Sequence, residues 1–189
     1  MARQEIRFTA VETATGALAV AWNERGMVGS WMHAGTVERA REQVRRSYPD
    51  ATEAAPPESV ATAIEDTRRL LAGELNDLHA APLDLSDVPD FDRRVYDVVR
   101  TIPPGQTMTY GQVAAALGEE PMKARDVGIA MARNRFAPFV PCHRVVAANG
   151  KLGGYSAPGG SATKRRLLEI EGVRLVPDEP LQTALFDQL

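Results

Sequence analysis

The chain has 189 residues and 44% apolar content, which is enough for one large domain or two small ones with a hydrophobic core. No apolar run approaches the roughly 18 residues of a membrane-spanning helix, and the N-terminus lacks the apolar segment of a secretory signal. A single cysteine and no targeting segment predict a cytoplasmic protein, and a net charge of −3 argues against nucleic acid as a partner of the chain as a whole.

Charge is unevenly distributed along the chain. Residues 1–89 carry 9 basic and 14 acidic side chains, residues 90–176 carry 13 and 8, and residues 177–189 carry none and 3. The middle segment is therefore positive by 5, and both of its flanks are negative. Such an asymmetry suggests a polyanionic partner for the basic segment, although scattered solvated arginines would give the same excess.

Residues 5–32 are predicted to form an antiparallel meander. Apolar and polar residues alternate along this stretch, as expected for strands with one buried face. Turn-forming sequences at residues 13–16 and 23–26 divide the stretch into three strands.

Two helices and a short strand complete the first part of the chain. Thr36 is suited to cap a helix that ends near Tyr48, and Ser59 is suited to cap a second helix. The short strand is expected at residues 83–85. Because residues 1–88 contain no catalytic constellation, we interpret them as a structural α/β domain.

Residues 89–176 are predicted to be mainly helical. A helix over residues 90–102 ends at Pro-Pro-Gly, and Thr109 is suited to cap a second helix over residues 110–117. A third helix is expected over residues 121–134. The last two helices, joined by a tight turn, match a helix-turn-helix DNA-binding motif, although most pairs of short helices only pack together.

The only cysteine, Cys142, lies in the sequence Val-Pro-Cys-His-Arg-Val-Val at residues 140–146. A single cysteine forms neither an internal disulfide nor a multi-thiolate metal site, so it is either an inert apolar residue of the core or a nucleophile. A proton acceptor, His143, and a fixed cation, Arg144, follow it directly. A nearby base or positive charge raises the thiolate fraction, which favours the nucleophile.

Three features follow the cysteine. Residues 145–152 are predicted to form a β-hairpin around Ala-Asn-Gly, and the glycine-rich loop at residues 153–160 is long enough to form the wall of a pocket. Ser161 is suited to cap a last helix, which Gly172 would end.

Together these residues resemble the methylated-DNA–protein-cysteine methyltransferases, also called O6-alkylguanine-DNA alkyltransferases. The resemblance covers about residues 89–173, whereas the N-terminal part matches only in general layout. It implies an α+β protein with an N-terminal antiparallel sheet and helices, ribonuclease H-like in the family, and a C-terminal helical, winged-helix-like DNA-binding alkyltransferase domain. The motifs that carry it are Pro-Cys-His-Arg-Val at 141–145, Thr-Tyr-Gly-Gln at 109–112, Arg125 nine positions before Asn134, Gly-Tyr-Ser at 154–156, and Leu-Leu ahead of Glu171 and Gly172.

The resemblance implies that Cys142 attacks the alkyl carbon on O6 of guanine. The product is a thioether, which is not hydrolysed, so the protein would act once. A water would link Cys142 to His143, because adjacent side chains diverge, and Glu171 would fix the tautomer of His143. Asn134 would order the turn around the cysteine, and Tyr110 would protonate the leaving base.

Each of these partners also has a purely structural alternative. Glu171 would then be a surface residue in the last turn of a helix, although a negative charge is unfavourable there. Asn134 would be an ordinary helix C-cap, and Tyr110 would pack on a neighbouring element. The resemblance favours the catalytic roles.

The same resemblance implies binding of double-stranded DNA in the minor groove and rotation of the alkylated base out of the duplex. Arg125 would fill the gap in the stack; its alternative is a phosphate contact or a solvated charge. Small residues at Ala124 and Gly128 would permit close approach. The other residues expected to contact DNA or the extruded base are Tyr110, Thr109, Arg144, Val145, Tyr155 and Ser156.

The sequence departs from the family pattern at several positions. Arg135 stands where proline is usual and would either loosen the turn or add a phosphate contact. Asp92 and Tyr96 replace the usual glutamine and tryptophan, and the loop at residues 157–160 is longer than in common members. An alkyltransferase-like protein that binds the lesion without transfer is the alternative function, but such relatives lack the cysteine that Cys142 provides.

Metals, cofactors and protein partners are the last expectations. Some relatives bind zinc through N-terminal cysteines, but this chain offers only His33 and His79 there, so no metal is expected. No cofactor is expected either, and the protein is expected to be a monomer. In the tail, residues 177–189, the sequence resembles the short peptide with which bacterial repair proteins bind the sliding clamp. The alternative is a tail that packs on its own domain. The clamp-binding residues would be Gln182, Leu185 and Phe186.

Overall fold

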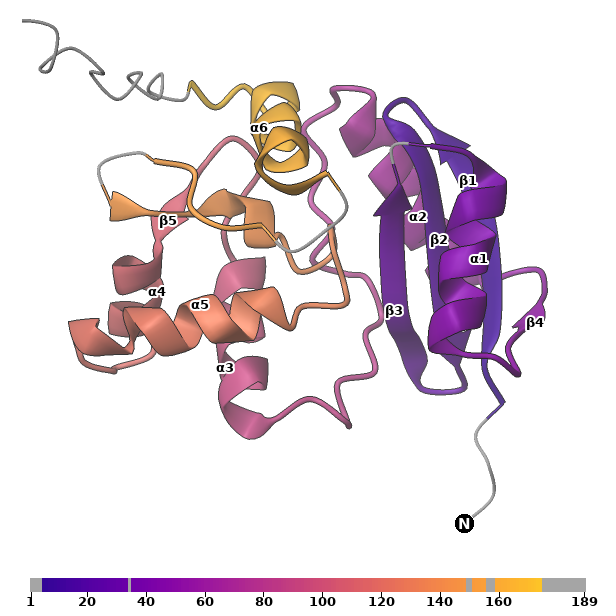
Figure 1. Ribbon diagram of the computed structural model, residues 1–189, viewed down its shortest axis with the longest axis horizontal. Helices are drawn as coiled ribbons and strands as arrows, with labels where there is room; N and C mark the ends of the chain where they lie inside the picture. Colours follow the sequence, from indigo (N-terminus) through magenta and orange to yellow (C-terminus); the bar gives the residue numbers. More distant parts are fainter. Residues whose placement is uncertain (1–4, 34, 149–150, 156–158, 175–189) are drawn as a thin grey trace, which may run out of the picture.

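The structure is a computed structural model that describes residues 5–33, 35–148, 151–155 and 159–174. Figure 1 shows an N-terminal sheet flanked by helices and, beside its β3 edge, a C-terminal group of helices. The α+β fold that the sequence predicts is confirmed. No helix in the described ranges is long and apolar enough to cross a membrane.

The predicted meander is confirmed as β1 (Arg7–Thr13), β2 (Gly16–Asn23) and β3 (Gly26–His33), paired antiparallel. The sequence prediction missed β4 (Thr52–Glu53), which pairs parallel to β1 and makes the sheet mixed, in the order β3-β2-β1-β4. This strand is only two residues long, so it has no alternation to reveal it.

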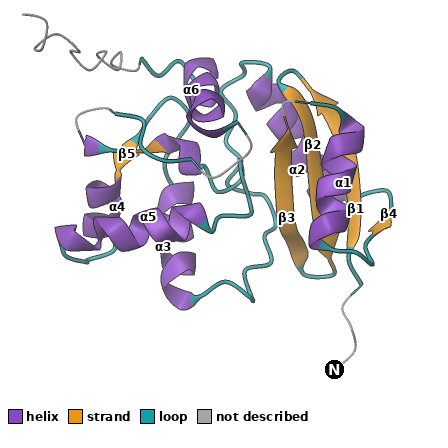
Figure 2. Ribbon diagram, viewed as in Figure 1, coloured by secondary structure: helices purple, strands orange, loops and turns teal. Residues whose placement is uncertain are grey.

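Helices cover both faces of the sheet (Figure 2). The face with Ala19 and Ala21 packs on α1 (Val37–Ser47), and the face with Leu18 and Val20 joins the core that includes α2 (Glu58–Leu71). Successive side chains of a strand point to opposite faces. Because both faces of the sheet are covered, β2 is buried along almost its whole length.

Two of the predicted helix starts can be compared directly with the structure. Thr36 caps α1 as predicted, and its side chain accepts a hydrogen bond from the amide of Arg39 at 3.4 Å. The prediction that Ser59 caps α2 is wrong: the helix begins one residue earlier, after Pro57, whose extended conformation and missing N–H suit a helix start. The strand predicted at residues 83–85 is only an isolated bridge between Leu83 and Met27.

The C-terminal helices begin with α3 (Asp90–Arg100) and α4 (Tyr110–Ala116). Thr109 caps α4 as predicted: its hydroxyl accepts from the Gln112 amide at 3.2 Å, and the Gln112 side chain accepts from the Thr109 amide at 2.7 Å. The third predicted helix is split into a 3-10 turn, η1 (Pro121–Lys123), and α5 (Ala124–Ala132). Asn134 therefore lies in the loop after α5 rather than in a helix.

The region after the cysteine differs from the predicted hairpin. Residues 145–146 form β6 (Val145–Val146), which pairs parallel to β5 (Met108–Thr109), a segment far away in the sequence. The Ala147 amide still donates to the Lys151 carbonyl at 2.8 Å, but the described residues on either side of 149–150 form no strand pair.

The last helix, α6 (Gly160–Ile170), has glycines near both of its ends. Ser161 is not its cap, because the N-cap is Gly159, whose φ of +86° is a left-handed conformation that glycine adopts without strain. Gly172, with a φ of +78°, follows the end of the helix as predicted.

The sheet is joined to the loop that precedes the cysteine through Ser30, a buried residue of β3. The Ser30 amide donates to the Arg135 carbonyl at 2.8 Å, and its hydroxyl donates to the Ala137 carbonyl at 2.8 Å. Arg135 also places its guanidinium 5.3 Å from the centre of the Phe136 ring. The N-terminal sheet thereby fixes the chain that leads to Cys142.

Candidate active site

Cys142 begins a short 3-10 turn, η2 (Cys142–Arg144), that follows an irregular segment of the chain. Asn134 fixes this segment from both of its polar atoms: its amide group donates to the Val140 carbonyl at 2.8 Å, and its oxygen accepts from the Phe136 amide at 2.9 Å. The Cys142 amide donates to the same Val140 carbonyl at 2.8 Å. The cysteine is 6% exposed, and the hydrogen bonds of Asn134 and of the Val140 carbonyl hold the loop that precedes it.

The Cys142 side chain lines a cavity of about 270 Å³ between α4, α5 and the glycine-rich loop. This volume lies just below the range of about 300–1,000 Å³ typical of pockets for drug-sized ligands, so it suits a single nucleobase. The other residues that line the cavity are Tyr110, Gly128, Met131, Ala132, Gly154 and Tyr155. The structure thus brings together four residues that the family resemblance had assigned to the site: Cys142, Tyr110, Gly128 and Tyr155.

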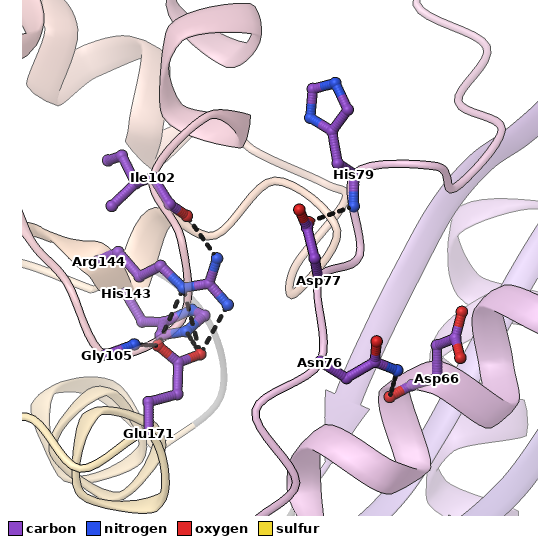
Figure 3. A network of polar contacts seen from close by, with 9 residues as sticks. All are labelled: Asp66, Asn76, Asp77, His79, Ile102, Gly105, His143, Arg144 and Glu171. Atoms are coloured by element: carbon purple, nitrogen blue, oxygen red, sulfur yellow. Dashed lines mark hydrogen bonds and ion pairs between the residues drawn. The ribbon is translucent and has the colours of Figure 1, made fainter.

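A buried carboxylate cluster is formed by Glu171 with His143 and Arg144, the two residues that follow Cys142 in η2 (Figure 3). Glu171 Oε1 lies 2.8 Å from His143 Nε2, and the Arg144 guanidinium donates to both carboxylate oxygens, from Nη2 at 2.8 Å and from Nε at 2.9 Å. Arg144 Nη1 donates to the Ile102 carbonyl at 2.6 Å, and the Gly105 amide donates to Glu171 at 3.3 Å. All three side chains are at most 3% exposed.

The electrostatics of the carboxylate cluster favour a neutral imidazole. Burial lowers the pKa of His143, and Glu171 only partly offsets this. Burial also opposes ionisation of Glu171, but hydrogen bonds and charges from His143 and Arg144 outweigh it and lower the pKa of Glu171 to about 2. An ionised Glu171 accepts a hydrogen bond from His143 Nε2, which leaves Nδ1 as the basic nitrogen. In the described part of the chain, Nδ1 is buried without a hydrogen-bond partner.

The environment of the sulfur differs from the expectation that Arg144 promotes its ionisation. Burial raises the pKa of the Cys142 thiol, and the groups that oppose this are Asn134, the positive charge of Lys164 and nearby backbone. Arg144 is neutralised by Glu171 instead. The thiol therefore rests in its protonated form, and a base has to remove its proton before attack.

Two tyrosines form the aromatic part of the cavity wall. Burial raises the pKa of both phenols, and charge on Cys142 would raise them further. The Tyr110 hydroxyl donates to the Gly154 carbonyl at 3.5 Å, and a Cβ on Gly153 would lie 3.2 Å from the Tyr110 ring. Gly153 has a φ of +70°, so its lack of a side chain serves both the backbone conformation and the close approach of the ring. Ser156, also predicted here, lies outside the described residues.

The residues predicted to contact DNA fall into two groups. Arg125 is exposed on α5, where Ala124 and Gly128 are partly exposed on the same helix. Arg144 and Val145, in contrast, are 2% and 0% exposed, so their side chains belong to the interior of the protein, and their contact with DNA or the extruded base stays a prediction. Contacts inside the protein account for this burial, since Arg144 pairs with Glu171 and Val145 is packed in the core.

Thr109, also predicted to contact DNA, is partly exposed, and its hydroxyl accepts the hydrogen bond that caps α4. This bond accounts for the threonine in local terms, since Thr109 and Gln112 form a reciprocal capping box. It also sets the start of α4, and with it the place of Tyr110 at the first position of that helix. Thr109 thus contributes to the cavity through Tyr110.

Sequence reasoning missed the burial of Lys164 on α6, which is 0% exposed. It shares a buried stripe with Leu167 and Leu168, at spacings of three and four residues. A lysine in line with the apolar positions of a helix is the signal that could have identified it, because lysine is almost never fully buried without a partner.

Comparison with known proteins agrees with this geometry. The model of the 6-O-methylguanine DNA methyltransferase DNA-binding domain matches residues 90–173. A methylated-DNA–protein-cysteine methyltransferase of Mycobacterium tuberculosis is 39% identical over 155 residues, which cover 81% of this chain and 88% of the relative. One from Methanothermobacter thermautotrophicus is 40% identical over 125 residues, which cover 66% and 68%.

Solved structures give the same result. A crystal structure of Mycobacterium tuberculosis OGT in complex with DNA has a TM-score of 0.70 at 32% identity, covering 88% of this chain and 93% of that one. The O6-methylguanine-DNA methyltransferase of Pyrococcus kodakaraensis has a TM-score of 0.65 at 25% identity, covering 89% and 99%. This chain belongs to the methylated-DNA–protein-cysteine methyltransferase family.

Proposed function

We propose that this protein repairs DNA by direct reversal, transferring an alkyl group from O6 of guanine to Cys142 in a single turnover. The observation that carries this proposal is that the only cysteine of the chain lines a base-sized cavity directly beside a buried, neutral histidine. The names of the relatives and the DNA complex of a structural neighbour support the same function.

The proposed reaction moves one proton out of the thiol and another into the purine. His143 Nδ1 removes the proton of Cys142 through a bridging water, and Glu171 stabilises the imidazolium that forms. The sulfur then bonds to the alkyl carbon as the bond between carbon and O6 breaks. The electron pair of the broken bond stays on the purine. Tyr110 gives its phenolic proton to the purine and later regains one from the solvent. The products are a thioether and unmodified guanine.

The test of this function is the intact mass of the protein after mixing with an oligonucleotide that contains O6-methylguanine. We expect a gain of one methyl group, limited to one per chain, because a thioether cannot release the sulfur. The alternative function, lesion binding without transfer, predicts that the protein binds the oligonucleotide while its mass stays constant. That outcome would contradict the proposal and favour the alternative.

We further propose that Arg125 enters the duplex when the alkylated base is rotated out. Unstacking a base costs a few kcal/mol, so Arg125→Ala should slow transfer from duplex DNA by on the order of a hundredfold. Transfer from free O6-benzylguanine, which has no stack to leave, should change little. Rates on both substrates provide the measurement, with Arg166→Ala, an exposed arginine on α6, as the control. Equal slowing on both substrates would contradict this role.

The C-terminal tail lies outside the described residues, so its proposed docking on the bacterial sliding clamp rests on sequence alone. An apolar Leu185–Phe186 pair would enter a pocket of the clamp, and Gln182 would bond to the rim. A peptide of residues 177–189 should bind the clamp, and the peptide with both apolar residues replaced by alanine should not. Absence of binding by the unmodified peptide would end this proposal.

We propose the cytoplasm as the compartment in which the protein acts on DNA. A nucleophilic cysteine has to stay a free thiol, and the reducing cytoplasm keeps thiols in that state.

A further inference from the structure

Two buried residues of α3, Asp92 and Tyr96, carry polar groups that the proposed reaction does not use. Both stand where the sequence departs from the family pattern, and they are 4% and 2% exposed. They are four residues apart, so they share one face of the helix. Burying a carboxylate costs free energy that an apolar residue would avoid, so packing alone does not account for Asp92.

Both side chains contact the C-terminal end of α5. The Tyr96 hydroxyl donates to the Ala130 carbonyl at 3.3 Å, and Asp92 Oδ2 lies 3.5 Å from Arg133 Nη1. Arg133 is the C-cap of α5, and its amide donates to the same Ala130 carbonyl at 3.2 Å. In the part of the chain that the structure describes, Asp92 Oδ2 is buried without a hydrogen-bond partner. The ion pair with Arg133 and the N-terminal end of the α3 dipole therefore offset the burial of this charge.

The end of α5 leads directly to the cysteine turn. Met131 and Ala132, in its last turn, line the cavity, and Asn134 is the first residue after the C-cap. Asn134 donates to the Val140 carbonyl at 2.8 Å, and this carbonyl also accepts from the Cys142 amide at 2.8 Å. A shift of the last turn of α5 would therefore displace a wall of the cavity together with the side chain that orders the cysteine turn.

Tyr96 also packs against the loop that follows α5. Its ring lies edge-on to Phe136 with the centroids 6.3 Å apart, and the Arg135 guanidinium lies 5.3 Å from the centre of the same Phe136 ring. The charges of Asp92 and Arg135 both act on the Tyr96 hydroxyl, and burial raises the pKa of this phenol, so it stays a neutral hydrogen-bond donor. Three departures from the family pattern, at positions 92, 96 and 135, thus lie around one aromatic pair.

We propose that Asp92 and Tyr96 are positioning residues that fix the last turn of α5 and, through Asn134, hold Cys142 in the geometry for alkyl transfer. This inference rests on the proposed transfer to Cys142. Neither of the two side chains lines the cavity, so both act through other residues rather than on the substrate.

The pH dependence of Cys142 labelling by iodoacetamide reports on this geometry without an alkylguanine. Asn134 counters the effect of burial on the pKa of the Cys142 thiol, so displacement of Asn134 should move the labelling midpoint to higher pH. Unfolding would move the midpoint to lower pH, because an exposed thiol loses the effect of burial. Removal of the Asp92 charge would, by itself, also favour the thiolate. The other titratable side chains around the thiol, from η2, α4, the glycine-rich loop and α6, stay in place in every variant: His143, Tyr110, Tyr155 and Lys164.

Two conservative variants separate positioning from general stability. Tyr96→Phe removes only the hydroxyl, and its control is Tyr48→Phe, which removes a hydroxyl that donates to the Val28 carbonyl at 3.2 Å. Asp92→Asn removes the charge with little change in shape, and its control is Asp97→Asn, at an exposed aspartate of the same helix. Urea unfolding identifies the conditions under which every variant is folded.

The ion pair is tested separately with Arg133→Gln. This variant should repeat the effects of Asp92→Asn, and the double variant should transfer no more slowly than Arg133→Gln alone, because both changes remove the same interaction. Slowing that adds up in the double variant would contradict a link from Asp92 to α5 through Arg133.

We expect Tyr96→Phe and Asp92→Asn to slow saturated transfer from free O6-benzylguanine roughly fivefold or more, because misplaced reacting groups lose the advantage of proximity. Both should shift the labelling midpoint to higher pH, and Tyr48→Phe and Asp97→Asn should behave like the wild type. A midpoint that stays at the wild-type pH in both folded variants, or an equal shift in the controls, would overturn the inference. If the wild type labels normally but gains no benzyl group, the proposed function fails, and the labelling shift still decides the positioning role.

Discussion

Cys142→Ser is expected to abolish the gain in mass after incubation with an O6-methylguanine oligonucleotide. A hydroxyl has nearly the same shape as a thiol but is far more weakly acidic, so His143, a neutral imidazole, cannot ionise it to a useful extent. The change should affect the chemistry alone, because the Cys142 backbone amide, which bonds to Val140, is retained. Intact mass spectrometry with an excess of oligonucleotide gives the measurement.

The control for this variant is binding to the same oligonucleotide, which should be close to that of the wild type. Cys142 lies at the wall of the cavity, and serine fills nearly the same space. A methyl gain that persists in Cys142→Ser would show that another side chain accepts the group. Loss of DNA binding together with the mass gain would show instead that the substitution disturbs the site as a whole.

Glu171→Gln is expected to destabilise the protein by about 3 kcal/mol or more at neutral pH, because it leaves the buried Arg144 cation without its anionic partner. Transfer should also slow, since a neutral amide stabilises the imidazolium of His143 less well than a carboxylate. Urea unfolding curves of wild type and variant provide the free-energy difference. Benzylguanine transfer at the same pH provides the rate.

The stability difference between wild type and Glu171→Gln should depend on pH in a defined direction. The pKa of Glu171 falls from 4.5 to about 2 on folding, so its stabilisation is complete above about 4.5 and is lost as the pH drops towards 2. The pKa of His143 is also lowered from 6.5, so wild type and variant alike lose stability below that pH. The two unfolding curves should therefore converge in acid. A difference that stays constant down to acid pH would contradict the pairing.

Features decided by local chemistry were predicted best from the sequence. Thr36 and Thr109 cap helices because the hydrogen bond that a side-chain oxygen accepts from an amide three residues ahead needs no distant partner. Ser59 and Ser161 failed as caps, although they are equally suitable residue types, because Pro57 and Gly159 already set the start of each helix. Residue type identifies candidate helix caps, and the conformation of the neighbouring backbone decides which residue becomes the cap.

Features that depend on distant partners were predicted less well. The turn-forming residues 148–150 predicted a hairpin, but Val145 and Val146 pair with residues that precede α4. Arg144 and Lys164 are charged, and charged residues are expected at the surface unless a partner is known. Their partners, Glu171 for Arg144 and the Val145 and Gly154 carbonyls for Lys164, come together only in the folded chain. The pairing of Glu171 with His143 was foreseen through the family resemblance, and the structure contains it.

The hydrogen bonds of Ser30 link the alignment of the strands in the sheet to the position of the distant Cys142 sulfur. Side chains along a strand alternate between faces, so a slip of β3 by a single residue would turn the Ser30 hydroxyl away from the C-terminal helices. The Ala137 carbonyl would then lose the Ser30 hydroxyl as its donor, and the loop leading to Cys142 would lose this hydrogen bond to the sheet. Mutations that alter pairing between β2 and β3 should therefore change the reactivity of Cys142, although the residues that line the cavity belong to neither strand.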